Sequence, residues 1–126
     1  MACNARTKGK NGELESAKIL NELLPHAKAR RSQQFKGDKT AADLTCPGLP
    51  NIQFEVKRRQ SMNLHSVMKK SLQDCGENDV PVILHRKDNE EWLMTIRLED
   101  LPAAIFNLLR EGSPKGISKD VEPRPG

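Results

Sequence analysis

The 126-residue sequence contains no tyrosine, one tryptophan and three phenylalanines. Proteins that hold single-stranded nucleic acid by stacking need several exposed rings, so this composition disfavours that mode of binding. No stretch approaches the roughly 20 apolar residues that cross a bilayer, and residues 1–11 lack the apolar centre of a secretory signal. We therefore expect neither membrane insertion nor secretion, and we expect a cytoplasmic protein without a membrane partner.

The cysteines and histidines form no local metal-binding pattern. Cys3, Cys46 and Cys75 are odd in number and make no Cys-x-x-Cys pair, which predicts reduced thiols rather than a zinc site or a disulfide framework. The histidines are equally scattered, and we expect ordinary surface or core residues at His26, His65 and His85.

The net charge of +4 is unevenly distributed. Residues 1–70 carry 14 Lys and Arg against 6 Asp and Glu, giving +8, whereas residues 71–126 carry 7 against 11, giving −4. A basic half is a candidate surface for a polyanion such as nucleic acid. The alternative is a solvated basic face without a partner, and charge alone does not decide between the two.

The apolar pattern predicts one α/β domain over residues 12–110, between a flexible basic arm at 1–11 and a disordered tail at 111–126. The tail mixes three Gly and three Pro with charged residues, and it cannot bury enough surface to order itself. We expect helices at 12–24, 64–75 and 101–109, strands at 27–31, 42–46, 51–57, 80–85 and 92–98, and a mobile loop at 32–41. This order is typical of a mixed central β-sheet flanked by helices.

Three polar residues of the predicted hairpin form a candidate site. Glu55 and Lys57 share one face of their strand, because residues i and i+2 point the same way. Asp43 lies on the preceding strand, across a Pro/Gly turn centred near Leu49. A turn with an odd number of residues places Asp43 opposite Glu55, whereas a turn of two or four residues places them on opposite faces.

Two neighbouring carboxylates repel each other and raise a pKa unless a cation lies between them. Mg²⁺ prefers one or two carboxylates together with water and phosphate oxygens. The carbonyl of Val56 lies between Glu55 and Lys57 and is a further candidate oxygen ligand. Lys57 cannot bind a metal, but it can hold a water or offset charge on a phosphate. Taken alone, Glu-x-Lys is more often found on a solvated strand face.

Glu13 strengthens the catalytic interpretation. On a helical wheel it lies in the middle of the apolar stripe of Ala17, Leu20 and Leu24, whereas Glu15 and Glu22 lie on the wet side. A carboxylate on an apolar stripe is costly unless it is paired or metal-bound. The alternative role is stabilisation of the helix N-terminus, where the helix dipole favours an anion.

Together these residues resemble the PD-(D/E)xK nuclease superfamily, which has a Glu in the first helix, then an Asp, then Glu-x-Lys on a following strand. The segments KGKNGELE (8–15) and ADLTCPGLPNIQFEVKRR (42–59) are similar to small Holliday-junction resolvase-like endonucleases of archaea and phages. The resemblance covers residues 8–98. Ala42 replaces the usual proline before the Asp, no tyrosine is present, and either Lys70 or Gln73 stands for a glutamine often found in the next helix.

The resemblance implies a restriction-endonuclease-like core and metal-dependent hydrolysis of DNA phosphodiester bonds. Mg²⁺, with Mn²⁺ as a substitute, would be held by Asp43, Glu55, the carbonyl of Val56 and, directly or through water, Glu13. Lys57 would position the attacking water. The implied catalytic residues are Glu13, Asp43, Glu55 and Lys57.

The basic residues that flank this site in sequence predict contacts to DNA phosphates without base specificity. They are Arg30, Arg31, Lys36, Lys39, Arg58, Arg59 and Lys70. We expect double-stranded or branched DNA as the partner, such as Holliday junctions in DNA recombination, in a bacterial or a phage-infected host cell. Two symmetric cuts at a junction imply a homodimer. The alternatives are a non-catalytic nucleic-acid-binding module on the same fold and a protein-interaction adaptor.

Overall fold

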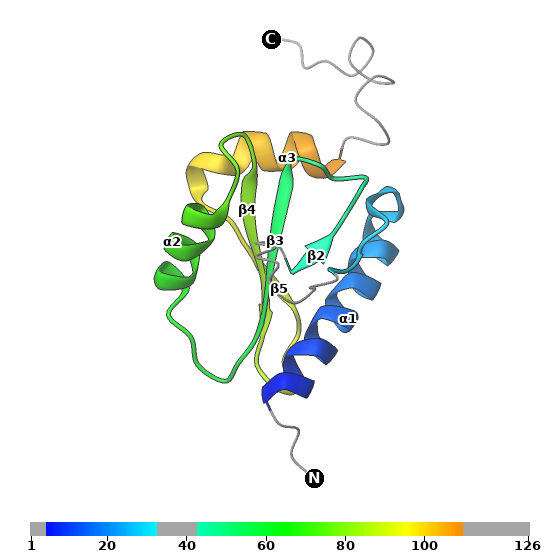
Figure 1. Cartoon of the computed structure of the whole chain (residues 1–126), viewed down its shortest axis with the longest axis vertical. Coiled ribbons are helices and arrows are strands. Elements are labelled where there is room, and N and C mark those ends of the chain that lie inside the picture. Colours follow the sequence, from blue (N-terminus) through cyan, green and yellow to red (C-terminus); the bar gives the residue numbers. More distant parts are fainter. Residues whose placement is uncertain (1–4, 33–42, 110–126) are drawn as a thin grey trace.

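The computed structural model describes residues 5–32 and 43–109 of the chain (Figure 1). Its elements are α1 (Ala5–Leu23), the 3-10 turn η1 (Pro25–Ala27), β1 (Arg30–Arg31), β2 (Leu44–Thr45), β3 (Ile52–Arg58), α2 (Leu64–Asp74), β4 (Val80–Arg86), β5 (Leu93–Thr95), the 3-10 turn η2 (Leu98–Asp100) and α3 (Leu101–Leu109). The predicted α/β class is confirmed in this coarse form.

The larger sheet has three strands in the order β3-β4-β5 and is mixed. β3 and β4 run parallel, joined by the crossover helix α2, and β5 pairs antiparallel with β4. The parallel register places Glu55 beside Ile83 and Lys57 beside His85. Residues opposite each other in a parallel pair share a face, so His85 lies on the same face as Lys57.

The larger sheet is covered by α1 on one face and α2 on the other, and α3 lies across one end (Figure 1). The hydrophobic core fills the α1 side, where Phe54 and Val82 are completely buried against residues of α1 and α3 such as Leu20 and Leu108. The α2 side buries less, with Met68 and Ser71 as the buried residues of α2. The sheet thus has one apolar face and one partly polar face.

The first helix is longer than its sequence pattern predicts, because it begins at Ala5 and not at Gly12. The helix therefore includes residues 5–11, for which the sequence predicts a flexible arm, and residues 1–4 lie outside the described part of the chain. Glycine destabilises a helix interior. Because this segment contains Gly9 and Gly12, its sequence does not predict a helix. Both glycines nevertheless lie within one continuous helix.

The predicted hairpin of residues 42–46 and 51–57 is wrong as a strand pairing. β2 pairs antiparallel with β1, so that Arg31 lies opposite Leu44. The Pro/Gly turn at 47–50 explains this, because the Gly48 N–H donates to the carbonyl of Ala27 at 3.1 Å. A Cβ at Gly48 would collide with the backbone carbonyl of His26. The turn therefore packs against η1 and directs β2 toward β1.

The remaining elements follow the sequence pattern closely. The helices expected at 64–75 and 101–109 and the strand expected at 80–85 are confirmed to within a residue. The strands expected at 27–31 and 92–98 shorten to β1 and β5. The loop predicted at 32–41 lies outside the described residues from 33 onward, as does the tail at 111–126. Within the described ranges, no helix is long and apolar enough to cross a membrane.

Candidate active site

Asp43 and Glu55 lie together at the outer edge of β3, on the side away from β4. The Asp43 N–H donates to the carbonyl of Phe54 at 2.9 Å, and the Val56 N–H donates to Asp43 Oδ2 at 2.8 Å. The carboxyl of Glu55 is within hydrogen-bonding reach of Asp43. β2 pairs with β1 and not with β3. The hydrogen bonds of Asp43 to β3 nevertheless hold the two carboxyls side by side.

The carbonyl of Val56 belongs to the same edge. In a strand, the N–H and the C=O of one residue point to the same side of the chain. Since the Val56 N–H donates to Asp43, the Val56 carbonyl also points toward the Asp43 side and away from β4. Three oxygen donor groups therefore share one edge: two carboxylates and a backbone carbonyl.

Lys57 forms an ion pair with Glu55, with 3.2 Å between Lys57 Nζ and Glu55 Oε2. Both side chains are only about one-fifth exposed, at 21% and 20%. They share the α2-facing side of β3, as strand periodicity predicts. The ammonium group is thus held next to the carboxyl pair.

A cavity of about 260 Å³ opens beside this pair, between β3 and α2. Glu55, Lys57 and Arg59 line it from β3 and its end, and Lys70 lines it from α2 together with Ser66, Val67 and Ser71. Of the two candidates in α2, Lys70 is therefore in the site, whereas Gln73 does not line this cavity. We name this space the Glu55 cavity.

Burial raises the pKa values of both carboxyls, and nearby negative charges raise them further, although a hydrogen bond with Glu55 partly lowers the pKa of Asp43. Burial is the main cause for Asp43, and the nearby charge of Glu13 raises its pKa further, while the Val56 N–H and Lys57 oppose the change. For Glu55, burial again raises the pKa most, followed by the charge of Asp43, and Lys57 and Lys70 oppose it. A pair of carboxyls in this state gains from a bound cation, which relieves the repulsion.

Glu13 lies near the pair but is held by Arg31. Its side chain is 19% exposed, and Glu13 Oε1 accepts a hydrogen bond from Arg31 Nε at 2.6 Å. Ala17 and Leu20 are buried on the same side of α1, in agreement with the predicted inward stripe. In the described part of the chain, no three His, Cys, Asp or Glu side chains form a group that could hold a metal ion.

Glu15 was expected on the wet side of α1, and this expectation is wrong. Its carboxylate pairs with Arg58 at 3.2 Å and with Arg86 at 3.7 Å, and Arg58 also contacts Asp88 at 3.3 Å. The guanidinium of Arg86 lies 5.9 Å from the centre of the Trp92 ring. Arg58 therefore ties α1 to the sheet through these ion pairs, and its predicted contact with DNA stays a prediction.

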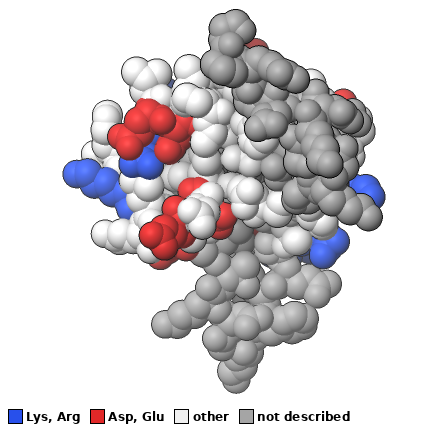
Figure 2. All heavy atoms as spheres, turned by 90° about the horizontal axis from the view of Figure 1, so that it is seen from above, with Lys and Arg blue, Asp and Glu red and all other residues white. Residues whose placement is uncertain are grey.

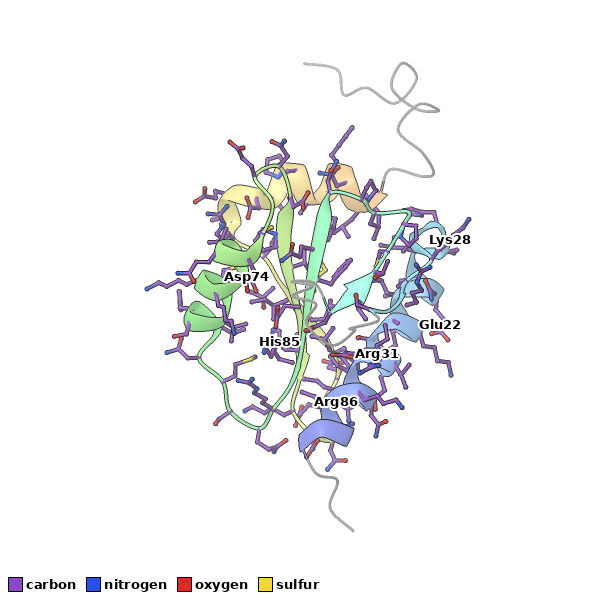
Figure 3. All side chains as sticks on the ribbon, viewed as in Figure 1. Glu22, Lys28, Arg31, Asp74, His85 and Arg86 are labelled. Atoms are coloured by element: carbon purple, nitrogen blue, oxygen red, sulfur yellow. The ribbon has the colours of Figure 1, made fainter. Side chains whose placement is uncertain are left out.

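The other predicted DNA contacts border the site on two sides. Arg30 and Arg31 in β1 lie next to Asp43, because the Ser32 N–H donates to the Asp43 carbonyl at 3.0 Å. Arg59 and Lys70 are exposed at the Glu55 cavity. In Figure 3, Arg31 and His85 lie on opposite sides of the lower half of β3. Two predicted contacts lie outside the described residues: Lys36 and Lys39.

The opposite end of the molecule is acidic. Seen from above, the acidic side chains of the described residues gather on one side of this face, with a few basic side chains among them (Figure 2). Asp79 and Asp100 belong to this end, where burial and their charges raise the pKa of the Cys75 thiol. No family model, curated protein or solved structure matches the chain.

Proposed function

We propose that this protein is a metal-dependent endonuclease that hydrolyses DNA phosphodiester bonds, with branched DNA such as Holliday junctions as its substrate. The proposal includes membership of the PD-(D/E)xK superfamily and its restriction-endonuclease-like core. One observation carries it: the adjacent carboxyls of Asp43 and Glu55, both with raised pKa values, lie beside the ammonium group of Lys57.

The donor atoms at this edge fit a hard divalent cation. Mg²⁺ binds oxygen ligands and usually retains several waters, so Asp43, Glu55 and the carbonyl of Val56 would suffice to hold it. Glu13 would join directly, once released from Arg31, or through water. When bound, Mg²⁺ or Mn²⁺ supplies an activated water and stabilises the negative charge that develops at phosphorus.

Lys57 would hold the attacking water or offset charge on the phosphate. Its ion pair with Glu55 at 3.2 Å keeps the ammonium group at the cavity wall. Arg59 and Lys70 are exposed on the same wall, where cations bind phosphate oxygens of any DNA sequence. Substrate choice by DNA shape rather than by base contacts is consistent with this set of side chains.

Cleavage by the purified protein tests the proposal. Supercoiled plasmid, linear duplex and a four-way junction are incubated with Mg²⁺, with Mn²⁺ or with EDTA. We expect cutting with either metal, none in EDTA, and a loss of roughly 10³-fold or more in Asp43→Asn. Asp74→Asn is the matched control, because Asp74 is an exposed carboxylate of α2 outside the site. A wild-type protein that cuts no substrate with either metal would refute the proposal.

The pairing of Glu13 with Arg31 favours a second candidate, a non-catalytic nucleic-acid-binding module on the same fold. In the described conformation Glu13 is engaged by a cation from β1, and a protein that only binds DNA has no need to release it. This candidate predicts DNA binding that is equal with and without metal, and no cleavage. Arg31→Ala would then weaken DNA binding without changing any metal response.

A homodimer belongs to the nuclease proposal, since resolution of a junction needs two cuts. The apolar residues 80–84 are buried in β4 and do not offer a surface for this interface. α3 exposes Leu101, Ile105 and Leu109, which are 43%, 50% and 64% exposed, and it is the better candidate. Light scattering with and without a four-way junction measures the mass in solution.

A further inference from the structure

A second and larger cavity adjoins the Glu55 cavity. Its volume is about 440 Å³, compared with about 260 Å³ for the Glu55 cavity. Arg59 lines both cavities, whereas Glu55 lines only the smaller one and Asp43 lines neither. The larger cavity lies where β3 and β4 end, between the loop that enters α2 and the turn that leaves β4. We name it the Arg59–Lys87 cavity.

The walls of this cavity combine three kinds of side chain. Arg59, Arg86 and Lys87 supply positive charge, Met62, Leu64 and Leu93 supply apolar surface, and Glu90 and Glu91 supply carboxylates. α2 begins at Leu64, so the positive end of its dipole lies at the cavity. The volume is in the range of sites that hold small molecules.

Arg86 is held in place before any ligand binds. Its guanidinium pairs with Glu15 at 3.7 Å and lies 5.9 Å from the centre of the Trp92 ring. Arg59 and Lys87 are exposed, and both are available for an anion that enters from solvent. The cavity therefore has one cation that is held by other side chains and two that are exposed to solvent.

This combination matches a nucleotide unit. A phosphate suits the cations, a flat ring suits the apolar surface, and carboxylates accept hydrogen bonds from the amino groups of bases. We propose that the Arg59–Lys87 cavity receives one unpaired nucleotide of the DNA strand that is cut at the Glu55 cavity. The inference rests on the proposed function and deepens it, because it specifies the substrate class.

The shared residue Arg59 sets the relation between the two cavities. Because Arg59 lines both cavities, a strand whose phosphate lies at the Glu55 cavity passes Arg59 on its way to the larger cavity. A base in an intact duplex would have to leave its stack and its pairing partner to enter, which is energetically unfavourable. A base that is already unpaired avoids this cost. The preferred substrate is therefore a strand with an unpaired nucleotide next to the cut.

Binding measured in EDTA tests the inference without cleavage. Two labelled duplexes of the same sequence are compared, one fully paired and one with a single unpaired nucleotide. We expect the wild type to bind the second duplex roughly tenfold more tightly, as a base contact of this kind provides. Equal affinity of the wild type for the two duplexes would overturn the inference.

Two variants assign the preference to the cavity. Ser61→Trp places a large side chain at an exposed position that lines the cavity, and Glu90→Gln combined with Glu91→Gln removes the carboxylates. Both should bring the affinity ratio of the two duplexes close to one. Lys69→Ala is the control, because Lys69 is exposed on α2 and lines neither cavity. A tenfold preference that persists in Ser61→Trp would place the recognition elsewhere and refute the inference.

Failure of this inference is distinguishable from failure of the proposed function. A wild type that cuts DNA with Mg²⁺ but binds both duplexes equally refutes the nucleotide cavity and leaves the nuclease standing. A wild type that prefers the unpaired nucleotide in EDTA but cuts nothing refutes the nuclease. The cavity would then serve the binding module.

Discussion

The two faces of β3 differ in composition, in burial and in the consequence of burial. Phe54 and Val56 face α1 and are 0% and 8% exposed. Glu55 and Lys57, which alternate with them along β3, face α2. Burial of the first pair removes apolar surface from water and stabilises the fold. Burial of Glu55 raises its pKa, which is a destabilising interaction at neutral pH. The apolar face of β3 therefore stabilises the strand, and its polar face carries a partly buried pair, Glu55 and Lys57, whose burial is unfavourable.

The largest expected effect comes from the apolar face. Phe54→Ala removes a completely buried ring and should lower the free energy of unfolding by about 3–5 kcal/mol, measured by urea denaturation. Gln53→Ala is the matched control on the other face of β3. Gln53 is half-buried and its Nε2 has no hydrogen-bond partner among the described residues. Gln53→Ala should change the free energy of unfolding by no more than about 0.5 kcal/mol. Equal losses would show that the two faces do not differ in stability.

The next effect sharpens the role of the polar face. Lys57→Ala leaves Asp43 and Glu55 in place, so metal binding should persist while cleavage falls by about 10²–10³-fold. Mn²⁺ binding is measured by calorimetry and cleavage by single-turnover kinetics. Asp43→Asn should instead reduce both. Cleavage by Lys57→Ala at the wild-type rate would remove Lys57 from the mechanism and leave the metal site intact.

The contrast between faces continues past the end of β3, in two consecutive arginines. Arg58 points to the α1 side and pairs with Glu15, whereas Arg59 is exposed at the two cavities. Arg58→Ala should therefore cost about 1–2 kcal/mol of unfolding free energy and leave the salt dependence of DNA binding unchanged. Arg59→Ala should do the reverse and lower the slope of log affinity against log salt by about 0.9. A lower slope of log affinity against log salt in Arg58→Ala would show that Arg58 does contact DNA phosphates.

Periodicity explains which parts of the fold are predictable from sequence. The alternation of residues 52–57 predicts that Glu55 and Lys57 share a face, and the apolar run at 80–85 predicts a buried strand. Both patterns are local, and the structure confirms them. The pairing of β2 with β1 depends on the fit of Gly48 against the backbone of η1. That contact joins residues far apart in sequence, and no local pattern encodes it.

The candidate site divides in the same way. The inward position of Glu13 follows from helical periodicity, but its ion pair with Arg31 depends on how β1 returns past α1. Glu15 reads as a solvent-facing residue on a helical wheel, yet it pairs with Arg58 and Arg86 at the ends of two strands. Ion pairs between residues this far apart in sequence cannot be predicted from residue spacing. Local geometry is therefore predictable, whereas the partners of charged side chains require the tertiary structure.

The smallest expected effect is a stability gain in the metal-free protein. Burial raises the pKa values of Asp43 and Glu55 in the folded state, so the folded state binds protons that the unfolded state has already released. The free energy of unfolding contributed by the pair is then fully present below the ordinary carboxyl pKa of about 4. It is lost as the pH rises through the folded-state values.

Asp43→Asn removes one of the two titrating groups and retains an oxygen that can accept the Val56 N–H. At pH 7 without metal it should be more stable than the wild type by about 1 kcal/mol, as is common where a site trades stability for function. The gain should shrink as the pH falls toward 4, because the wild-type carboxyls become protonated. The lowered pKa of His85, caused by burial, has the opposite pH dependence, but it is present in both proteins and cancels in their difference. Thermal unfolding from pH 4 to 8 in EDTA measures this difference, with Asp74→Asn as the control. A variant that is less stable than the wild type at pH 7 would show that the polar face of β3 stabilises the fold, and the contrast between the two faces would disappear.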